Sequence, residues 1–172
     1  VDVEVSGAPA KLLAATLMLM LTQVASFGLT TNVWDGGGAN ALASNPLNWV
    51  GDVAPVAGDA IILDTTTNKS MTWDLNISPG SWSQVGYTGT VTIATLYGTT
   101  GFTNLNITGD CTISNGVWTH SANSGGETNW LRATIGGNLV IGTGAVIDVT
   151  GKGYAAGKGP GVGTGGSYGG LG

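Results

Sequence analysis

The sequence predicts an all-β fold of the β-solenoid class, in which short strands stack coil upon coil. One five-residue sequence motif occurs three times, at Gly89–Ile93, Gly109–Ile113 and Gly137–Ile141. Each copy is a glycine followed by apolar side chains at every second position, which is the period of a β-strand. The numbering offset between successive copies is 20 (109 − 89) and then 28 (137 − 109). Self-similarity at periods of roughly 20 to 30 residues is typical of solenoids.

The composition agrees with stacked strands joined by tight turns. Charged residues make up 9% of the 172 residues, far below the roughly 25% of ordinary globular domains. The hydrophobic fraction of 42% is normal, so the chain is not of the disordered class. The net charge of −5 argues against a nucleic-acid partner, because nucleic-acid binding needs a basic patch or stripe.

The alternating apolar residues of the three copies define the expected core. They are Val91, Ile93, Cys111, Ile113, Leu139 and Ile141. Cys111 is the single cysteine, so it forms no intramolecular disulfide, and we interpret it as a small core residue rather than a reactive thiol. We expect Ile113→Asp and Ile141→Asp to prevent folding, because each would bury a charge. Lys69→Ala is expected to be nearly silent.

Residues 1–28 are predicted to be a signal peptide. The run 12–24 is apolar and uncharged, follows Lys11, and is followed by the small residues Ser26 and Gly28. It is too short for an ordinary membrane span and fits the apolar region of a secretory signal. We therefore expect a secreted or cell-surface protein. The alternatives are a buried core helix and a membrane anchor that is not cleaved.

Residues 29–63 are predicted to form an N-terminal cap and the first strand. Three glycines at 36–38 and the prolines at 46 and 55 interrupt any strand ladder there. Trp34 and Trp49 supply apolar rings that would cover the open end of a solenoid, which otherwise exposes strand edges and core. The alternative is that these two rings form a sugar-stacking platform. The first strand is expected at 60–63.

Four short stretches carry a resemblance to a known class of proteins. They are Trp34–Gly38, Asn48–Asp52, Pro55–Asp59 and Gly86–Thr90. Through them the chain resembles the N-terminal region of large bacterial secreted and cell-surface β-helix proteins, including autotransporter-like and adhesin-like passengers. The spacing from Asn48 to Asp59 is also similar to the start of G8-type domains. The resemblance covers nearly all of the chain after the signal peptide. It implies an exported right-handed parallel β-helix and offers no catalytic pattern.

Residues 64–150 are predicted to form the β-helix coils, and residues 151–172 a glycine-rich loop or tail. Within the coils, the loop 121–129 is expected to lengthen the last coil by eight residues, and Trp118 to lie level with Val146. Glycine occupies 11 positions from 151 to 172, so this segment cannot bury enough surface to order itself. We expect it to be a lateral loop, and the chain to be the N-terminal piece of a longer protein.

The residues that could carry chemistry are few. His120, the only histidine, is expected to be a polar side chain at a coil corner. Asp110, Asn138 and Asp148 recur near the repeat turns and could hold calcium, although turn stabilisation explains them as well. Asp74, Asp110 and Asp148 could share one face, as a glycosidase would need. No motif supports catalysis, so we expect no enzyme, no cofactor and no metal.

These observations favour a structural or adhesin-like segment of an exported surface protein. Its expected partners are surface glycans or other cell-surface proteins. Membrane contact is expected only through the signal segment or a C-terminal anchor absent from this sequence. One alternative is a carbohydrate-binding segment with exposed Trp82, Trp118 and Trp130 as stacking plates. The other is part of a β-helical polysaccharide-degrading enzyme with its active site on later coils.

Overall fold

The computed structural model describes residues 30–98, 101–123 and 126–155. The expected signal peptide (1–28) and residues 156–172 of the glycine-rich segment lie outside these ranges. Within them the chain forms nine strands and one short 3₁₀ helix, η1 (Pro46–Asn48). No helix in the described part of the chain is long and apolar enough to cross a membrane.

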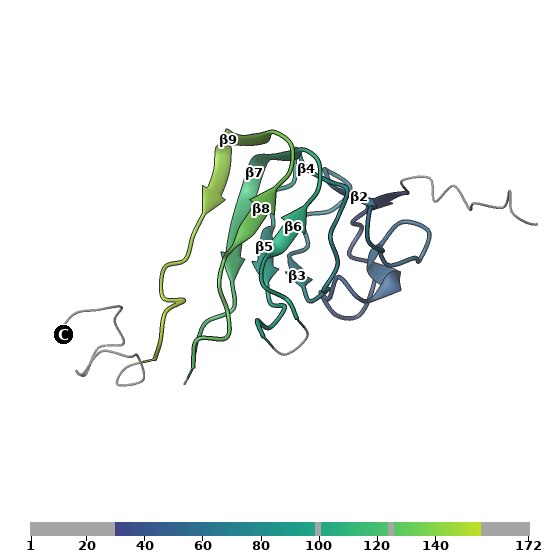
Figure 1. The fold of residues 1–172 in the computed structure, drawn as a ribbon. Helices are drawn as coiled ribbons and strands as arrows, with labels where there is room; N and C mark the ends of the chain where they lie inside the picture. Colours follow the sequence, from purple (N-terminus) through teal and green to yellow (C-terminus); the bar gives the residue numbers. More distant parts are fainter. Residues whose placement is uncertain (1–29, 99–100, 124–125, 156–172) are drawn as a thin grey trace, which may run out of the picture.

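All pairings between the strands are parallel, and the strands stack in a row along one direction (Figure 1). The strands are β1 (Thr31–Val33), β2 (Ala60–Leu63), β3 (Met71–Trp73), β4 (Ser81–Gln84), β5 (Thr90–Ile93), β6 (Leu105–Ile107), β7 (Cys111–His120), β8 (Ala133–Ile135) and β9 (Leu139–Ile147).

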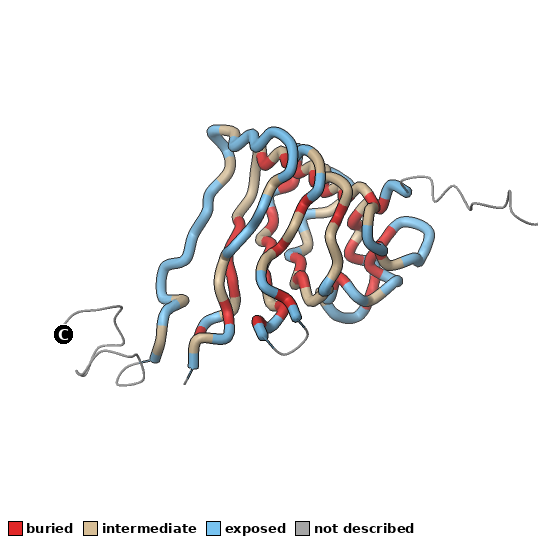
Figure 2. The backbone as a smooth tube through the Cα atoms, viewed as in Figure 1, coloured by how far each residue is buried: buried red, intermediate tan, exposed pale blue. Residues whose placement is uncertain are grey.

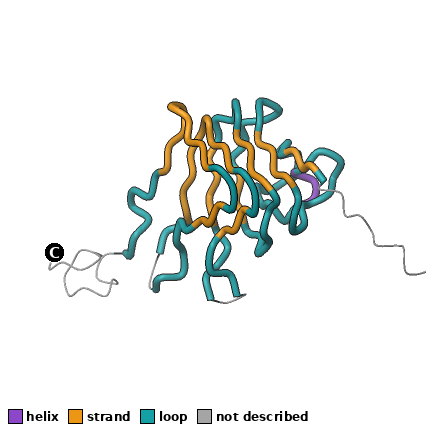
Figure 3. Tube along the Cα trace, turned by 45° about the horizontal axis from the view of Figure 1, so that its top comes forward, coloured by secondary structure: helices purple, strands orange, loops and turns teal. Residues whose placement is uncertain are grey.

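The coils have three sides, and the pairings give one ladder of strands to each side (Figure 3). One ladder runs β1–β2–β4 and continues into the first half of β7. A second runs β3–β5 and continues into the second half of β7, so β7 turns a corner between two sides. β9 follows β7 along both halves, and β6 pairs with β8 on the third side. The predicted parallel β-helix is confirmed.

The corner in β7 requires glycine. Gly116 has φ of +81°, a left-handed conformation that other residues adopt only with strain. A Cβ atom there would lie 2.7 Å from the carbonyl oxygen of Gly89 in the preceding coil. The side chain of Asn115 completes this corner, because its Oδ1 accepts a hydrogen bond from the backbone N–H of Gly86 at 2.9 Å. The coils can therefore approach closely only with glycine at 116.

Alternate residues of β2 to β6 and of the first half of β7 are buried, and they build the interior (Figure 2). The parallel register stacks the inward side chains of successive coils in columns, such as the column of Ile61, Trp82 and Cys111. A second feature is an edge-to-face chain of indoles, with centroids 5.2 Å apart from Trp73 to Trp82 and from Trp82 to Trp118. Such pairs contribute roughly 0.5–1.5 kcal/mol beyond the area they bury. Cys111 is fully buried, as expected for a small core residue.

The register corrects part of the predicted repeat. Cys111 pairs with Leu139, which confirms the offset of 28 (139 − 111). Cys111 also pairs with Trp82, an offset of 29 (111 − 82), whereas β5 pairs with the second half of β7. The copy at 89–93 therefore lies on a different side from the other two, and its assignment as the preceding coil is wrong. The last two coils are equally long within one residue, so the loop 121–129 adds no eight-residue excess.

A bulge explains a smaller error in the register. Between Ile113 and Asn115 the pairing with β9 shifts by one residue. As a result Trp118 lies beside Ile147, one residue beyond the expected Val146. The extra residue lies in β9, where three steps from Ile141 to Gly144 match two steps from Ile113 to Asn115 in β7. Sequence periodicity alone does not reveal such a bulge, because the strand continues on both sides of it.

The loop-rich N-terminal cap is confirmed. Trp34 and Trp49 are fully buried and pack edge to face with their ring centroids 5.3 Å apart. The indole N–H of Trp34 donates to the carbonyl of Lys69 at 2.9 Å, and that of Trp49 to the carbonyl of Ala43 at 2.8 Å. Because both rings are enclosed, the alternative of a sugar-stacking platform at this end is wrong.

Lys69 holds the cap loop to the first coil. Its ammonium group donates to the carbonyl oxygens of Gly36 at 2.6 Å and of Gly38 at 2.5 Å. Its own carbonyl accepts from Trp34 and from the hydroxyl of Tyr87. Hydrogen bonds that involve a charged group contribute about 1.5–3 kcal/mol each. The expectation that Lys69→Ala is nearly silent does not agree with these contacts.

Asp59 fastens the other edge of the cap. Its carboxylate accepts from the side chain of Asn32 at 2.9 Å, from the backbone N–H of Val56 at 2.9 Å, and from the hydroxyl of Thr30. Burial acts to raise the pKa of this carboxyl, but the hydrogen bonds outweigh burial and hold the pKa below its ordinary value of 3.8. The ionised form is therefore the one that stabilises the cap.

We expect Ile113→Asp and Ile141→Asp to differ sharply in stability, which revises the expectation from the sequence. Ile113 is 1% exposed, so aspartate there buries an unpaired carboxylate and should abolish the cooperative unfolding transition. Ile141 is 49% exposed, so aspartate there should cost about 1 kcal/mol. Urea unfolding followed by circular dichroism measures both. Equal losses of stability in the two variants would contradict the placement of Ile141 at an open end.

The second prediction concerns pH. Because the folded-state pKa of Asp59 lies below the unfolded value of 3.8, its stabilising effect is present above about pH 4. It is lost as the pH falls through the lowered folded-state pKa. Asp59→Asn should therefore lower the free energy of unfolding by about 1–3 kcal/mol at pH 7 and by less at pH 3. The matched control is Asp52→Asn, on an exposed loop of the same cap. A loss for Asp59→Asn that is the same at both pH values would refute the role of its ionised form.

Candidate functional site

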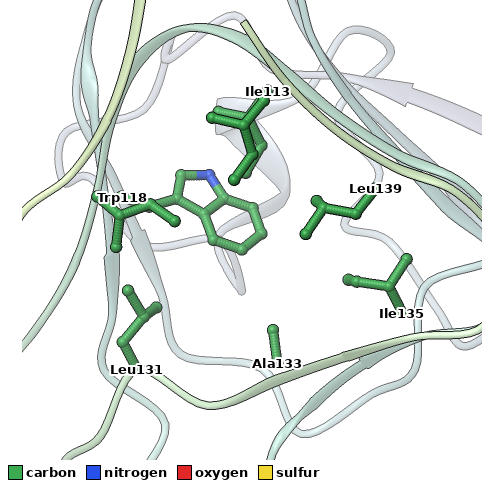
Figure 4. A pocket seen from close by; sticks show the side chains of 8 residues that line it. Ile113, Trp118, Leu131, Ala133, Ile135 and Leu139 are labelled. Carbon is green, nitrogen blue, oxygen red and sulfur yellow. The ribbon is translucent and has the colours of Figure 1, made fainter.

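The last described coil leaves its apolar interior uncovered. A cavity of about 230 Å³ opens there, lined by Ile113, Trp118, Leu131, Ala133, Ile135, Leu139, Ile141 and Ile147 (Figure 4). Every lining side chain is apolar apart from the indole N–H of Trp118. We call this cavity and the strand β9 beside it the open end of the solenoid.

Register explains why these residues face the cavity. Leu139, Ile141 and Ile147 pair with Cys111, Ile113 and Trp118, whose side chains are buried in the preceding coil. The predicted inward direction of Leu139 and Ile141 is therefore confirmed. Their enclosure is not, because Leu139 is 53% and Ile141 49% exposed. Within the described residues β9 pairs only with β7, so its other edge carries no strand.

Trp118 forms the polar edge of this cavity and is held rigidly. Its indole N–H donates to Oε1 of Gln84 at 2.8 Å, and Nε2 of Gln84 donates to the carbonyl of Asn115 at 2.6 Å. Gln84 is itself fully buried. A buried polar side chain that has both ends bonded fixes the geometry around it. The floor of the open end is thus preorganised by the coil beneath it.

The structure buries two of the three tryptophans expected to stack on sugars. Trp82 is 1% exposed and Trp118 is 3% exposed, because both lie at inward positions of the coil. The expectation that they form exposed stacking plates is wrong. Trp82 lies between Ser81 and Ser83, an alternation that indicates an inward ring, whereas Trp118 follows Val117 and carries no such signal.

Trp130 is the half-buried member of that set and lines a cavity on the coil loops. This cavity has a volume of about 250 Å³ and is floored by Tyr97 and Phe102. The guanidinium carbon of Arg132 lies 5.1 Å from the centroid of the Trp130 ring, and the Tyr97 ring packs at 4.3 Å. The Trp130 indole N–H donates to Glu127. With Tyr97 and Arg132 against it, the ring offers a sugar little free face, and glycan binding at Trp130 stays a prediction.

The carboxylates are not brought together. Asp74 accepts from the backbone N–H of Ser44 at 2.9 Å and from its hydroxyl at 2.5 Å. Asp110 precedes β7 on one side of the coil, whereas Asp148 follows β9 on another side. Asp74 and Asp148 share a ladder but lie three strands apart, which is about 14 Å. A glycosidase needs about 5–10 Å between its two carboxyl groups.

The candidate calcium ligands serve the turns instead. Oδ1 of Asp110 accepts from the backbone N–H of Asn138 at 2.7 Å and from its side-chain amide at 3.2 Å, which ties two coils together. Oδ1 of Asp148 accepts from the backbone N–H of Thr150 at 2.8 Å, and hydrogen bonding to Thr150 lowers the pKa of Asp148. Among the described residues no group of three acidic, histidine or cysteine side chains could hold a metal.

His120 and Cys111, the potential base and the potential nucleophile, are also buried within the fold. His120 ends β7 at 8% exposure, and its Nδ1 lies 2.8 Å from the carbonyl oxygen of Ser121, so Nδ1 carries the proton. Cys111 is enclosed, and burial raises the pKa of its thiol to about 11. A thiol with that pKa is overwhelmingly protonated at neutral pH and does not act as a nucleophile.

Sequence reasoning missed the residues that support the two cavities. Gln84 could have been found, since it is a single polar residue at an inward position two places after Trp82. Glu127, Arg132 and Tyr154 could not, because they meet Trp130 or one another only through the folding of long loops. Comparison with known proteins finds no match to a family model, to a curated protein or to a solved structure.

Proposed function

We propose that the chain is a non-catalytic structural segment of an exported surface protein, of the stalk or adhesin-like kind. The observation that carries the proposal is that the side chains described below serve the packing and bonding of the coils. Apolar groups fill a continuous interior, and polar groups bond one coil to the next, as Asp110 bonds to Asn138 and Gln84 to Trp118. A stack of this kind is a stiff rod whose cross-section repeats.

The two alternatives have weaker support. A polysaccharide-degrading site on the described coils would need paired carboxylates, and Asp74, Asp110 and Asp148 lie on separate corners or three strands apart. A carbohydrate-binding role would have to rest on Trp130 alone, whose ring is packed against Tyr97 and Arg132. Surface glycans and other cell-surface proteins stay the expected partners of an adhesin-like segment.

Export rests on the sequence of residues 1–28. Its apolar run carries no charge and fits a secretory signal. The one cysteine of the chain is buried, so the fold depends on core packing and not on disulfides. The proposed location is therefore the secreted or cell-surface fraction.

The test is to produce the full chain in a bacterial host with alkaline phosphatase fused after Gly172. This reporter is active only where its own disulfides form, outside the cytoplasm. We expect active fusion and cleavage of the chain by protease added to intact cells. The control is Leu17→Arg, which places a charge in the apolar run and should abolish both signals. An inactive fusion that is protected in intact cells would overturn the proposal.

A further inference from the structure

The first coil of the stack is shorter than the coil that follows it. β3 pairs with β5 at an offset of 20 residues (91 − 71), and β2 pairs with β4 at an offset of 21 (81 − 60). The pairing of β4 with β7 then has an offset of 29 (111 − 82). The chain can thus close a coil with either number of residues, so coil length alone does not determine which strand lies above β4.

A second register is therefore open to the segment after β5. Another coil of 20 residues would place β7 above β5, as the repeated motif at 89–93 and 109–113 suggests, and would place β6 above β4. In that register Ile113 would lie above Ile93, which is also buried. The structure instead pairs Ile113 with the polar residue Gln84. Apolar alternation does not favour the observed register, so specific contacts must select it.

Gln84 makes such contacts, because both ends of its amide are bonded to β7. The side chain is fully buried. Its Oε1 accepts from the indole N–H of Trp118 at 2.8 Å, and its Nε2 donates to the carbonyl of Asn115 at 2.6 Å. In the competing register β7 would lie on another side of the coil, and the amide would face Leu105 and Ile107 of β6. A buried amide without partners loses its hydration and gains nothing in return.

We propose that Gln84 specifies the register of the stack, because its buried amide finds partners only when β4 lies directly below β7. This role goes beyond the proposed structural function, since it concerns the choice between two stacking arrangements of one chain. A single buried polar residue is known to fix the register of a coiled coil in the same way, by making the alternative arrangement leave a polar group unpaired.

Two neighbouring tryptophans separate hydrogen bonding from packing. Trp82 and Trp118 are 1% and 3% exposed, and their rings pack edge to face with centroids 5.2 Å apart. The indole N–H of Trp118 donates to Gln84, whereas that of Trp82 has no hydrogen-bond partner in the described part of the chain. Replacement by phenylalanine removes the same atoms at either position, but only at 118 does it remove a hydrogen bond.

The test is the disulfide that a cysteine at position 112 forms on oxidation. The full chain carries Ser83→Cys, Thr92→Cys and Thr112→Cys together, is refolded from denaturant under reducing conditions, and is then oxidised by air. Position 112 lies beside position 83 in the observed register and beside position 92 in the competing one. Peptide mapping by mass spectrometry gives the ratio of the two disulfides and detects any bond to the native Cys111. With Gln84 present we expect the 83–112 disulfide to predominate.

Gln84→Met keeps the length of the side chain and removes its hydrogen-bonding atoms. It should raise the ratio of the 92–112 to the 83–112 disulfide about tenfold or more, because the competing register no longer buries an unpaired amide. Trp118→Phe should shift the ratio in the same direction. The matched control is Trp82→Phe, which should leave the ratio unchanged. Thermal unfolding checks that each variant folds cooperatively.

An unchanged ratio in Gln84→Met would overturn the proposal. Equal shifts in Trp118→Phe and Trp82→Phe would also overturn it, since packing and not the hydrogen bond to Gln84 would then select the register. If Gln84→Met does not fold, the comparison of Trp118→Phe with Trp82→Phe still decides the question.

Discussion

The structure depends on one constraint: a coil of this chain can cover its apolar interior only with the next coil. In the described part of the chain no strand has a helix or a second stack packed behind it, so each inward side chain is buried by its neighbours above, below and across the coil. The same parallel register that forms the backbone ladder therefore also forms the core. A one-residue slip would turn Ile61, Trp82 and Cys111 outward at once. Hydrogen bonding and burial cannot be separated in such a molecule.

Both ends of the stack show what this constraint requires. At the first end Trp34 and Trp49 close the interior, with Lys69 and Asp59 fastening the loops that carry them. At the other end the inward positions of β9 are half exposed, and its outer backbone edge carries no strand in the described part of the chain. Within the described residues the interior is thus closed at the first end and uncovered at the last coil.

The sequence predicted the architecture well and the register less well. Alternation at Cys111–Ile113 and Leu139–Ile141 identified two stacked strands, because both copies occupy the same side of successive coils. The copy at 89–93 has the same local pattern but lies on another side, since every strand of a solenoid needs the same alternation. The tryptophans were misjudged for a related reason. Local alternation indicates the inward direction of Trp82, between two serines, but only the register shows that Trp118 points inward. The bulge after Ile113 and the loop contacts of Trp130 leave no periodic signal.

The coil register is the claim on which the rest of this account stands, and engineered disulfides test it directly. Thr112 lies on the outer face of β7, where the structure pairs it with Ser83, an offset of 29 (112 − 83). The repeated sequence motif alone would pair Thr112 with Thr92, an offset of 20 (112 − 92). Neighbouring strands lie about 4.8 Å apart, within the range of Cα separations that a disulfide spans. Air oxidation should cross-link the Ser83→Cys/Thr112→Cys double variant and leave Thr92→Cys/Thr112→Cys reduced. The reverse result would contradict the stacking of β4 on β7.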